Sequence, residues 1–192
     1  MDETGRVRLW LLRHAKSSWD RPGLEDRERP LSRRGAHAAA LLRGFIDAEG
    51  IHPDLVLCSS ALRTRETLAG ILPALGPVLD IRVEDSIYTF AGDVLLDRIR
   101  AIPTEVGAAM VIGHNPAMQE LALSLASRGE PLSDLAEKLP TGALAEIRFA
   151  EGTWSDLGDG NGELTRFVTP RELEAADRLT RGSASRPSGT RR

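Results

Sequence analysis

The sequence has one cysteine, no long apolar run and no excess of basic residues. With a single thiol, Cys58, no intramolecular disulfide can form, which fits a reducing cytoplasm. No uninterrupted apolar stretch approaches the ~20 residues that span a bilayer, and the acidic N-terminus lacks the basic and apolar regions of a signal peptide. Lysine and arginine total 25 against 28 aspartate and glutamate residues, which argues against a general nucleic-acid binder. We therefore expect a cytoplasmic protein without membrane or nucleic-acid partners.

The length and composition are those of a single domain. The chain has 192 residues, of which 41% are hydrophobic and 28% charged, and it can bury one sizeable core. No linker or internal repeat divides it. From residue 180 the sequence is mainly Ser, Arg, Gly and Pro. We therefore expect one domain over residues 1–179 and a disordered tail over 180–192.

Apolar runs alternate with helix-like segments along the chain. The runs predict strands at 7–12, 54–58 and 108–112, with a short edge strand at 81–83. Helices are predicted from a cap at Ser32 to about residue 49, and over 64–75, 94–102 and 116–127, the last beginning at Pro116. Two further strands, 143–149 and 164–168, pair across a Gly-rich turn at 158–162. This order predicts an α/β fold: an open, mostly parallel sheet with helices on both faces and a C-terminal antiparallel strand pair.

Three of the predicted strands end in residues that bind anions. Arg13 and His14 follow the first, Ser59-Ser60 and Arg63 the second, and His114 the third. In an open α/β sheet, ligands bind outside the carboxyl ends of the strands. We therefore expect both arginines and both histidines in one pocket. The long polar segment 17–32 is expected to be a functional loop.

These residue types suit phosphoryl chemistry. An arginine guanidinium fits phosphate oxygens with two parallel hydrogen bonds, and a helix beginning after Ser59-Ser60 adds backbone N–H donors. A neutral imidazole attacks phosphorus, whereas a cationic one stabilises charge on the phosphoryl oxygens. A single histidine at a strand end is more often structural, so the hypothesis depends on the joint placement.

Other polar residues are interpreted as structural. His37 and His52 follow no such strand end and are expected to be structural or exposed. Cys58 ends an apolar run and is expected to be a small buried residue rather than a nucleophile. The four arginines between residues 27 and 34 are interpreted as a solvated face with local ion pairs.

The motifs at these positions resemble those of the histidine phosphatase superfamily, which has the phosphoglycerate-mutase-like fold. Arg13-His14-Ala15 is similar to the family's Arg-His-Gly, with a small residue kept at the third position. Ser59, Arg63 and Thr67 match Ser-x-x-x-Arg-Ala-x-x-Thr, with Thr64 in the alanine position, and Gly113-His114 matches the third element. The resemblance covers about residues 7–170. It is strongest to the SixA-like branch of phosphohistidine phosphatases, through the segments 12–17, 29–31, 113–116 and 139–142.

The resemblance implies a metal-independent phosphatase without a cofactor. His14 would be the nucleophile, and Arg13, Arg63 and His114 would hold the phosphoryl group. In mutase-like members a Glu or Asp after the second motif protonates the leaving oxygen, which makes Asp85 or Glu84 a candidate acid, although neither stands in a recognisable motif. Substrate-binding residues would be Arg13, Arg63 and His114 together with Lys16, Ser17 and Asn115.

Several functions remain open at this point. The leading hypothesis is hydrolysis of phosphohistidine on proteins. Alternatives are a small-molecule phosphomonoesterase or mutase, a non-catalytic phosphate- or phosphoprotein-binding module, and a metal hydrolase using His14 and His114. The last lacks the clustered carboxylates of such sites. Little chain is left for a long lid, so we expect an open pocket that binds phosphate or sulfate and admits a phosphorylated side chain of a folded partner.

Overall fold

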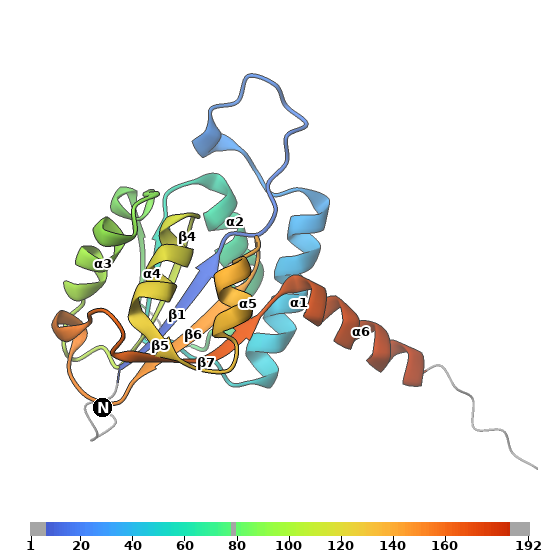
Figure 1. Cartoon of the computed structure of the whole chain (residues 1–192). Coiled ribbons are helices and arrows are strands. Elements are labelled where there is room, and N and C mark those ends of the chain that lie inside the picture. The colour runs from blue at the N-terminus through green and yellow to red at the C-terminus, as the bar shows by residue number, and fades with distance from the viewer. Residues whose placement is uncertain (1–6, 78–79, 185–192) are drawn as a thin grey trace, which may run out of the picture.

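A seven-stranded sheet forms the centre of the molecule (Figure 1). The computed structural model describes residues 7–77 and 80–184. The strand order is β3-β2-β4-β1-β6-β7-β5, and β6 runs antiparallel to both its neighbours while the other pairs are parallel. The bounds are β1 (Val7–Arg13), β2 (Leu55–Ser59), β3 (Asp80–Glu84), β4 (Ala108–Gly113), β5 (Ala126–Arg128), β6 (Leu144–Phe149) and β7 (Gly162–Val168). The expected mostly parallel α/β sheet with a C-terminal antiparallel pair is confirmed.

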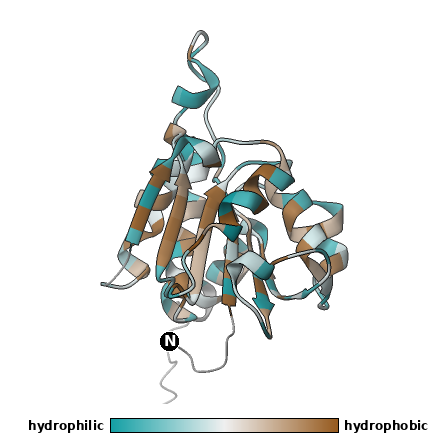
Figure 2. Cartoon of the chain, turned by 90° about the vertical axis from the view of Figure 1, so that its left-hand side faces the viewer, coloured by the Kyte–Doolittle hydropathy of each residue, from teal (hydrophilic) through white to brown (hydrophobic). Residues whose placement is uncertain are grey.

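Helices cover both faces of this sheet. One face carries α1 (Arg33–Ala48) and α2 (Leu62–Ile71), with α6 (Pro170–Ala184) packed against α1, and the other carries α3 (Gly92–Arg100), α4 (Ala117–Leu125) and α5 (Leu132–Glu137). Successive side chains of a strand point to opposite faces. Accordingly, Leu9 and Leu11 enter the core on one face, and Trp10 and Leu12 enter the other. Figure 2 shows the resulting hydrophobic strands between more polar helices.

Several boundaries differ from the sequence-based expectation. Helix α2 begins at Leu62 rather than 64, so that Arg63 lies in its first turn. Pro116 is the N-cap of α4 rather than its first residue. Residues 126 and 127, expected to end that helix, belong instead to β5, which pairs with β7. Helix α5 was not expected at all.

Residues 180–184, expected to belong to a disordered tail, are helical. Helix α6 continues to Ala184, and Arg181 forms an ion pair with Asp177 one turn earlier. Residues 185–192 lie outside the described part of the chain. Within the residues described, none of the helices combines the length and the hydropathy needed to cross a bilayer.

Strand register brings the two histidines to one edge of the sheet. Arg13 at the end of β1 lies opposite Gly113 at the end of β4, and Cys58 of β2 lies opposite Ile112. The next residues along the chain, His14 and His114, therefore leave adjacent strands at the same level. The backbone N–H of His14 donates to the Gly113 carbonyl at 3.1 Å. The carboxyl ends of these parallel strands thus form the floor of a site.

Residues 17–32 project from this edge as a long loop, at the top of Figure 1. An isolated antiparallel bridge between Ser17 and Leu31 closes its base, and residues 26–28 form a 3₁₀ turn. Helix α1 then begins with Ser32 as its N-cap, whose hydroxyl accepts from the Gly35 N–H at 3.1 Å, as expected. A side chain at Gly35 would meet the Lys16 carbonyl, so this glycine permits the loop base to pack on the helix.

Candidate active site

A pocket of about 400 Å³ opens at the carboxyl edge of the sheet, beneath the projecting loop. It brings together all four residues expected there from the sequence, and also the three expected substrate contacts. Its lining comprises Arg13, His14, Lys16, Ser17, Trp19, Asp26, Arg29, Arg63, Phe90, His114, Asn115 and Thr141. A larger groove of about 720 Å³ shares Lys16 and Thr141, but none of its described lining residues is a histidine. The smaller pocket therefore contains the candidate chemistry.

His14 presents one ring nitrogen to the pocket. Its Nδ1 lies 2.7 Å from the carbonyl oxygen of Ala15. Because a carbonyl only accepts, Nδ1 carries the proton, and Nε2 is left with its lone pair. Arg63 Nε donates to this Nε2 at 3.3 Å. Burial of the ring, together with the nearby charges of Arg63 and Arg13, lowers the pKa of His14 to about 4, so the imidazole is neutral at pH 7.

His114 lies beside His14, with the ring centroids 5.1 Å apart. Its Nδ1 lies 3.2 Å from Arg63 Nη2 and its Nε2 lies 2.8 Å from the hydroxyl of Ser59. Arg63 has no acceptor, so Nδ1 accepts and Nε2 carries the proton. Burial, His14 and Arg63 lower the pKa of His114 to about 3. Both rings are therefore neutral in this structure, and each has its tautomer fixed by a neighbour.

Arg63 connects the two histidines to the projecting loop. It lies in the first turn of α2 and is only 3% exposed. Besides its bonds to both imidazoles, Nη1 donates to the Asp26 carbonyl at 2.5 Å and Nη2 to the Asp26 carboxylate at 2.8 Å. The guanidinium thus faces the pocket with nearly all its donors in use.

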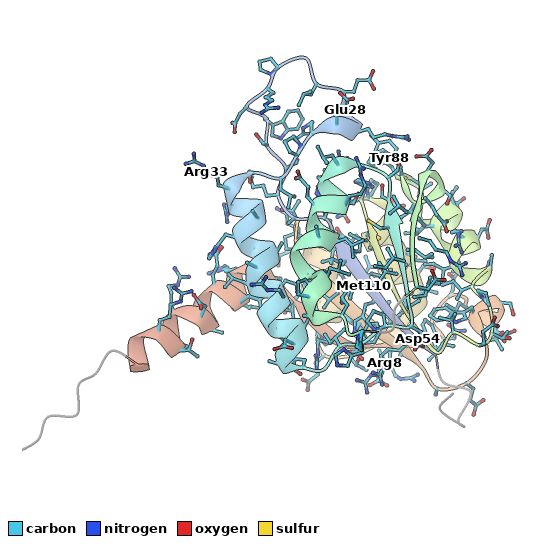
Figure 3. The ribbon with its side chains drawn as sticks, turned by 180° about the vertical axis from the view of Figure 1, so that it is seen from behind. Arg8, Glu28, Arg33, Asp54, Tyr88 and Met110 are labelled. Carbon is cyan, nitrogen blue, oxygen red and sulfur yellow. The ribbon has the colours of Figure 1, made fainter. Side chains whose placement is uncertain are left out.

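Asp26 is a pocket residue that the sequence did not reveal. Its carboxylate accepts hydrogen bonds from Arg63, from Arg29 at 2.9 Å and from the Tyr88 hydroxyl at 2.8 Å. Partial burial opposes its ionisation, but the bonds from Tyr88, Arg63 and Arg29 outweigh this and lower the pKa of Asp26 to about 2. Figure 3 shows Tyr88 at the same end of the molecule as Glu28 in the 3₁₀ turn. Asp26 is therefore an ionised carboxylate that ties the loop to the floor.

Arg29 is not part of the solvated face that was expected for the four arginines between residues 27 and 34. It is 8% exposed, and its guanidinium donates to the Ser17 hydroxyl, the Ser18 carbonyl and Asp26. Its Cζ also lies 3.2 Å from the centre of the Trp19 indole ring. The Arg29-Pro30-Leu31 segment was the available signal, since it belongs to the motifs that carry the family resemblance. Thr141 had the same signal through the segment 139–142, whereas Trp19 and Phe90 had none.

Arg13 and Asn115 share one anchor at the opposite wall. Arg13 Nη1 and Asn115 Nδ2 both donate to the carbonyl of Leu139, at 2.7 and 3.2 Å. The following turn is fixed by Gly142, whose positive φ of 82° suits glycine and whose N–H lies 3.0 Å from the Arg13 and His14 carbonyls. Arg13 Nε and Asn115 Oδ1 are buried without a hydrogen-bond partner among the described residues.

Known proteins share both the motifs and the fold. The model of the histidine phosphatase superfamily (branch 1) matches residues 9–90. The uncharacterized protein Rv1276c of Mycobacterium tuberculosis is 35% identical over 164 residues, which cover 83% of this chain and all of the relative. The proposed phosphohistidine phosphatase SixA from Agrobacterium tumefaciens is 31% identical with a TM-score of 0.71, covering 85% of this chain and 99% of that structure. A second proposed SixA, from Nakamurella multipartitia, is 28% identical with a TM-score of 0.74, covering 86% and 97%.

The chain belongs to the histidine phosphatase superfamily. It is a phosphatase of the SixA-like branch with the phosphoglycerate-mutase-like fold, as the sequence motifs predict. Ala15 stands where the family motif has glycine. Its backbone φ in this histidine phosphatase is not positive, so the position does not require glycine. The Ala15 N–H donates to the Thr67 hydroxyl at 3.0 Å.

The two candidate acids lie outside the pocket lining of this phosphatase. Glu84 forms two hydrogen bonds of 2.7 Å with Arg98, which lowers its pKa. Asp85 accepts from Ser60 and from Arg27, which also lower its pKa, and its side chain is 73% exposed. The sequence position after the second motif was misleading because these carboxylates have nearby cationic or hydroxyl partners. Asp26 is the carboxylate that lines the pocket among the residues described.

The remaining expectations concern metals and other polar residues. In the described part of the chain, no group of three or more His, Cys, Asp or Glu side chains is arranged to hold a metal ion. Cys58 is buried, as expected, and burial raises the pKa of its thiol to about 12. His37 and His52 are exposed.

Proposed function

We propose that this phosphatase hydrolyses phosphohistidine on proteins, without a metal ion, through a phosphoryl group carried by His14. The observation that carries the proposal is the fixed tautomer of His14. Its Nδ1 is held by the Ala15 carbonyl, and its unprotonated Nε2 faces Arg63. A neutral imidazole with a directed lone pair is the form that attacks phosphorus.

In the first step, the Nε2 lone pair of His14 attacks phosphorus and the bond to the leaving group breaks, with its electron pair going to the leaving group. The phosphoryl oxygens lie against Arg13, Arg63 and His114, while Lys16, Ser17 and Asn115 line the pocket around them. A dianion between these groups favours protonation of His114, which then donates a charge-assisted hydrogen bond. The arginines and His114 stabilise the charge that spreads over the equatorial oxygens.

In the second step, water attacks the phosphorus atom and the bond to His14 Nε2 breaks. The electron pair of that bond returns to the imidazole. A proton passes from the water to the phosphate that is released, which restores the neutral histidine. No metal or cofactor enters either step.

The absence of a protonated carboxyl group among the described lining residues favours a nitrogen leaving group. Asp26, with a pKa of about 2, is ionised and cannot donate a proton at pH 7. An alkyl oxygen needs a proton to leave, whereas the imidazole of a ring-protonated phosphohistidine leaves as a neutral molecule. The SixA proteins that this chain resembles are themselves proposed phosphohistidine phosphatases, which supports the same substrate class.

The test is to trap the intermediate. Enzyme quenched during turnover of a ³²P-labelled phosphohistidine protein should carry a base-stable, acid-labile phosphoryl group, which peptide mapping places on His14. His37→Ala removes an exposed histidine outside the pocket and should keep both the label and full activity. EDTA should change neither result. A label on another residue, or activity lost in EDTA and restored by a metal, would overturn the mechanism, and a higher kcat/KM for a small phosphate ester would favour a phosphomonoesterase.

A further inference from the structure

Two exposed aromatic side chains lie at the mouth of the pocket. Trp19 is 77% exposed and Phe90 is 48% exposed, and both line the same pocket as His14. They come from different segments, Trp19 from the projecting loop and Phe90 from the connection between β3 and α3. Exposed aromatic residues that converge on a pocket are typical of binding surfaces, because covering them removes a large apolar area from water.

Trp19 is held in place although it is exposed. The guanidinium of Arg29 covers one face of the indole, with Cζ 3.2 Å from the ring centre. Arg29 is itself fixed by its bonds to Ser17, Ser18 and Asp26. Since most of the indole remains exposed, its other face is open to a ligand. An ordered ring loses less conformational entropy on binding than a mobile one.

Phe90 continues a row of rings that starts at the nucleophile. Its centroid lies 5.7 Å from that of His114 and 5.6 Å from that of Tyr88. His114 in turn lies 5.1 Å from His14. Phe90 therefore packs its inner side on the floor and exposes the rest at the mouth.

We propose that Trp19 and Phe90 bind a planar aromatic leaving group, and that the ring is the imidazole of phosphohistidine. The floor residues His14, Arg63 and His114 are at most 7% exposed, so the leaving group departs toward the open side of the pocket. Attacking and leaving atoms are roughly in line in phosphoryl transfer, which points the leaving group away from His14. A planar ring there stacks on aromatic side chains, whereas an open-chain alcohol such as glycerol has no flat face to stack. The assignment to imidazole rests on the proposed function, but the ring preference does not.

Four substrates distinguish the effect of the bond that is cleaved from the effect of a ring on the leaving group. N-phosphoimidazole and phosphoramidate share an N–P bond, and phenyl phosphate and glycerol 3-phosphate share an O–P bond. Only the first of each pair carries a ring. Trp19→Ala and Phe90→Ala should each lower kcat/KM for the ring-bearing substrates by about three- to tenfold, mainly through KM, from the usual contribution of an aromatic pair. The ringless substrates should change less than about twofold by the same reasoning.

Two control variants test whether the effect requires an aromatic ring at the pocket. Trp19→Phe keeps a ring and should restore most of the loss. Leu179→Ala removes a side chain that is 76% exposed but lies on α6, outside the pocket, and should change nothing. Equal losses on all four substrates would show that the rings only support the loop, and unchanged values on the ring-bearing pair would show that they are bystanders. Either result overturns the proposal.

Binding measurements separate this proposal from the proposed function. Phenylphosphonate and methylphosphonate cannot be hydrolysed, and calorimetry should show tighter binding of the phenyl compound to wild-type enzyme but not to the Trp19→Ala/Phe90→Ala double variant. That result would support the aromatic mouth even if no N–P substrate were hydrolysed, in which case phosphohistidine hydrolysis alone would fail. Equal affinity for the two phosphonates would overturn the proposal that Trp19 and Phe90 bind an aromatic ring. A larger ring effect with phenyl phosphate than with N-phosphoimidazole would overturn the assignment to imidazole.

Discussion

The floor of the pocket and the loop above it are built in different ways. The floor residues Arg13, His14, Arg63 and His114 leave adjacent strands or the first turn of a helix, so the backbone of the sheet sets their positions. The loop residues Trp19, Asp26 and Arg29 are placed instead by side-chain contacts. These contacts lie within residues 17–32, except that Asp26 also accepts from Arg63 and Tyr88. Figure 2 shows this loop as a largely hydrophilic projection above the apolar strands.

Because they are built differently, the floor and the loop are expected to contribute to different steps, the floor to phosphoryl transfer and the loop to substrate binding. Both histidines are almost fully buried, and a hydrogen bond to a neighbouring residue fixes the tautomer of each. The ion pairs of the loop are partly exposed, and such pairs contribute about 0–1 kcal/mol each. We infer that the floor determines whether phosphoryl transfer occurs, whereas the loop determines which phosphoryl donor enters and how tightly it binds.

Replacement of His14, the proposed nucleophile, should have the largest effect. His14→Ala should lower kcat by at least about 10⁴-fold, as loss of a catalytic nucleophile does in other covalent enzymes. Phosphate binding should remain measurable by calorimetry, because Arg13, Arg63 and His114 are kept. His52→Ala, another exposed histidine outside the pocket, should behave as wild type. Substantial turnover by His14→Ala would show that the floor does not act through a phosphohistidine intermediate.

Replacement of Arg63 should have the second largest effect. Lysine keeps the charge but not the planar fork that spans both imidazoles and the pocket. Arg63→Lys should lower kcat/KM by about 100-fold, close to the 3 kcal/mol typical for loss of one transition-state donor. The control is Arg65→Lys, an exposed arginine on the same helix and outside the pocket. A change below about fivefold in Arg63→Lys would show that charge alone is needed there.

The floor could be predicted from the sequence because regular structure determines it. Apolar runs define the ends of parallel strands, and parallel strands deliver their following residues to one edge. This reasoning places His14 and His114 without any side-chain detail. It fails for Arg63 only in the exact start of α2, where a two-residue shift moves the arginine into the first turn.

The loop could not be predicted because no periodic pattern governs it. Asp26 is one acidic residue among several in residues 17–32, and only the folded loop brings it to Arg63 and Tyr88. Glu84 and Asp85 were the more obvious carboxylates by sequence order, yet their partners are Arg98, Arg27 and Ser60. Tertiary ion pairing, which has no local sequence signature, decides which carboxylate lines the pocket.

Acid should destabilise the folded protein through the two buried histidines of the floor. The folded-state pKa values of His14 and His114, about 4 and about 3, lie below the unfolded value of 6.5. The unfolded chain therefore binds more protons below pH 6.5, and stability present above that pH is lost as the pH falls toward 4. Between pH 7 and 5 the free energy of unfolding should fall by about 2 kcal/mol for each histidine.

Urea unfolding at several pH values measures this loss. The His14→Asn/His114→Asn double variant lacks both titrating rings and should lose much less stability over the same interval. Few aspartates and glutamates titrate above pH 5, so this window isolates the histidines. A double variant with the wild-type slope would show that the two rings bind protons alike in the folded and the unfolded protein.

The smallest expected effect tests whether the loop acts on the floor. The Asp26 carboxylate accepts from Arg63 Nη2, so a phosphoryl dianion bound at Arg63 would lie close to another negative charge. Such repulsion at about 4 Å is worth about 1 kcal/mol in water and more where solvent is partly excluded. Asp26→Asn keeps an oxygen acceptor and removes the charge. It should therefore tighten binding of inorganic phosphate by about five- to tenfold, with the gain reduced in high salt.

Calorimetry with inorganic phosphate at low and high salt measures this gain, and Glu25→Gln provides the matched control. Glu25 is an exposed acid on the same loop but does not line the pocket, so its loss changes net charge without removing the contact to Arg63. It should leave phosphate affinity unchanged. If Asp26→Asn instead weakens phosphate binding, then orienting Arg63 matters more than repelling the ligand. In that case the loop would assist the floor rather than limit its affinity, because the guanidinium would need the Asp26 carboxylate to hold its donors toward the two histidines.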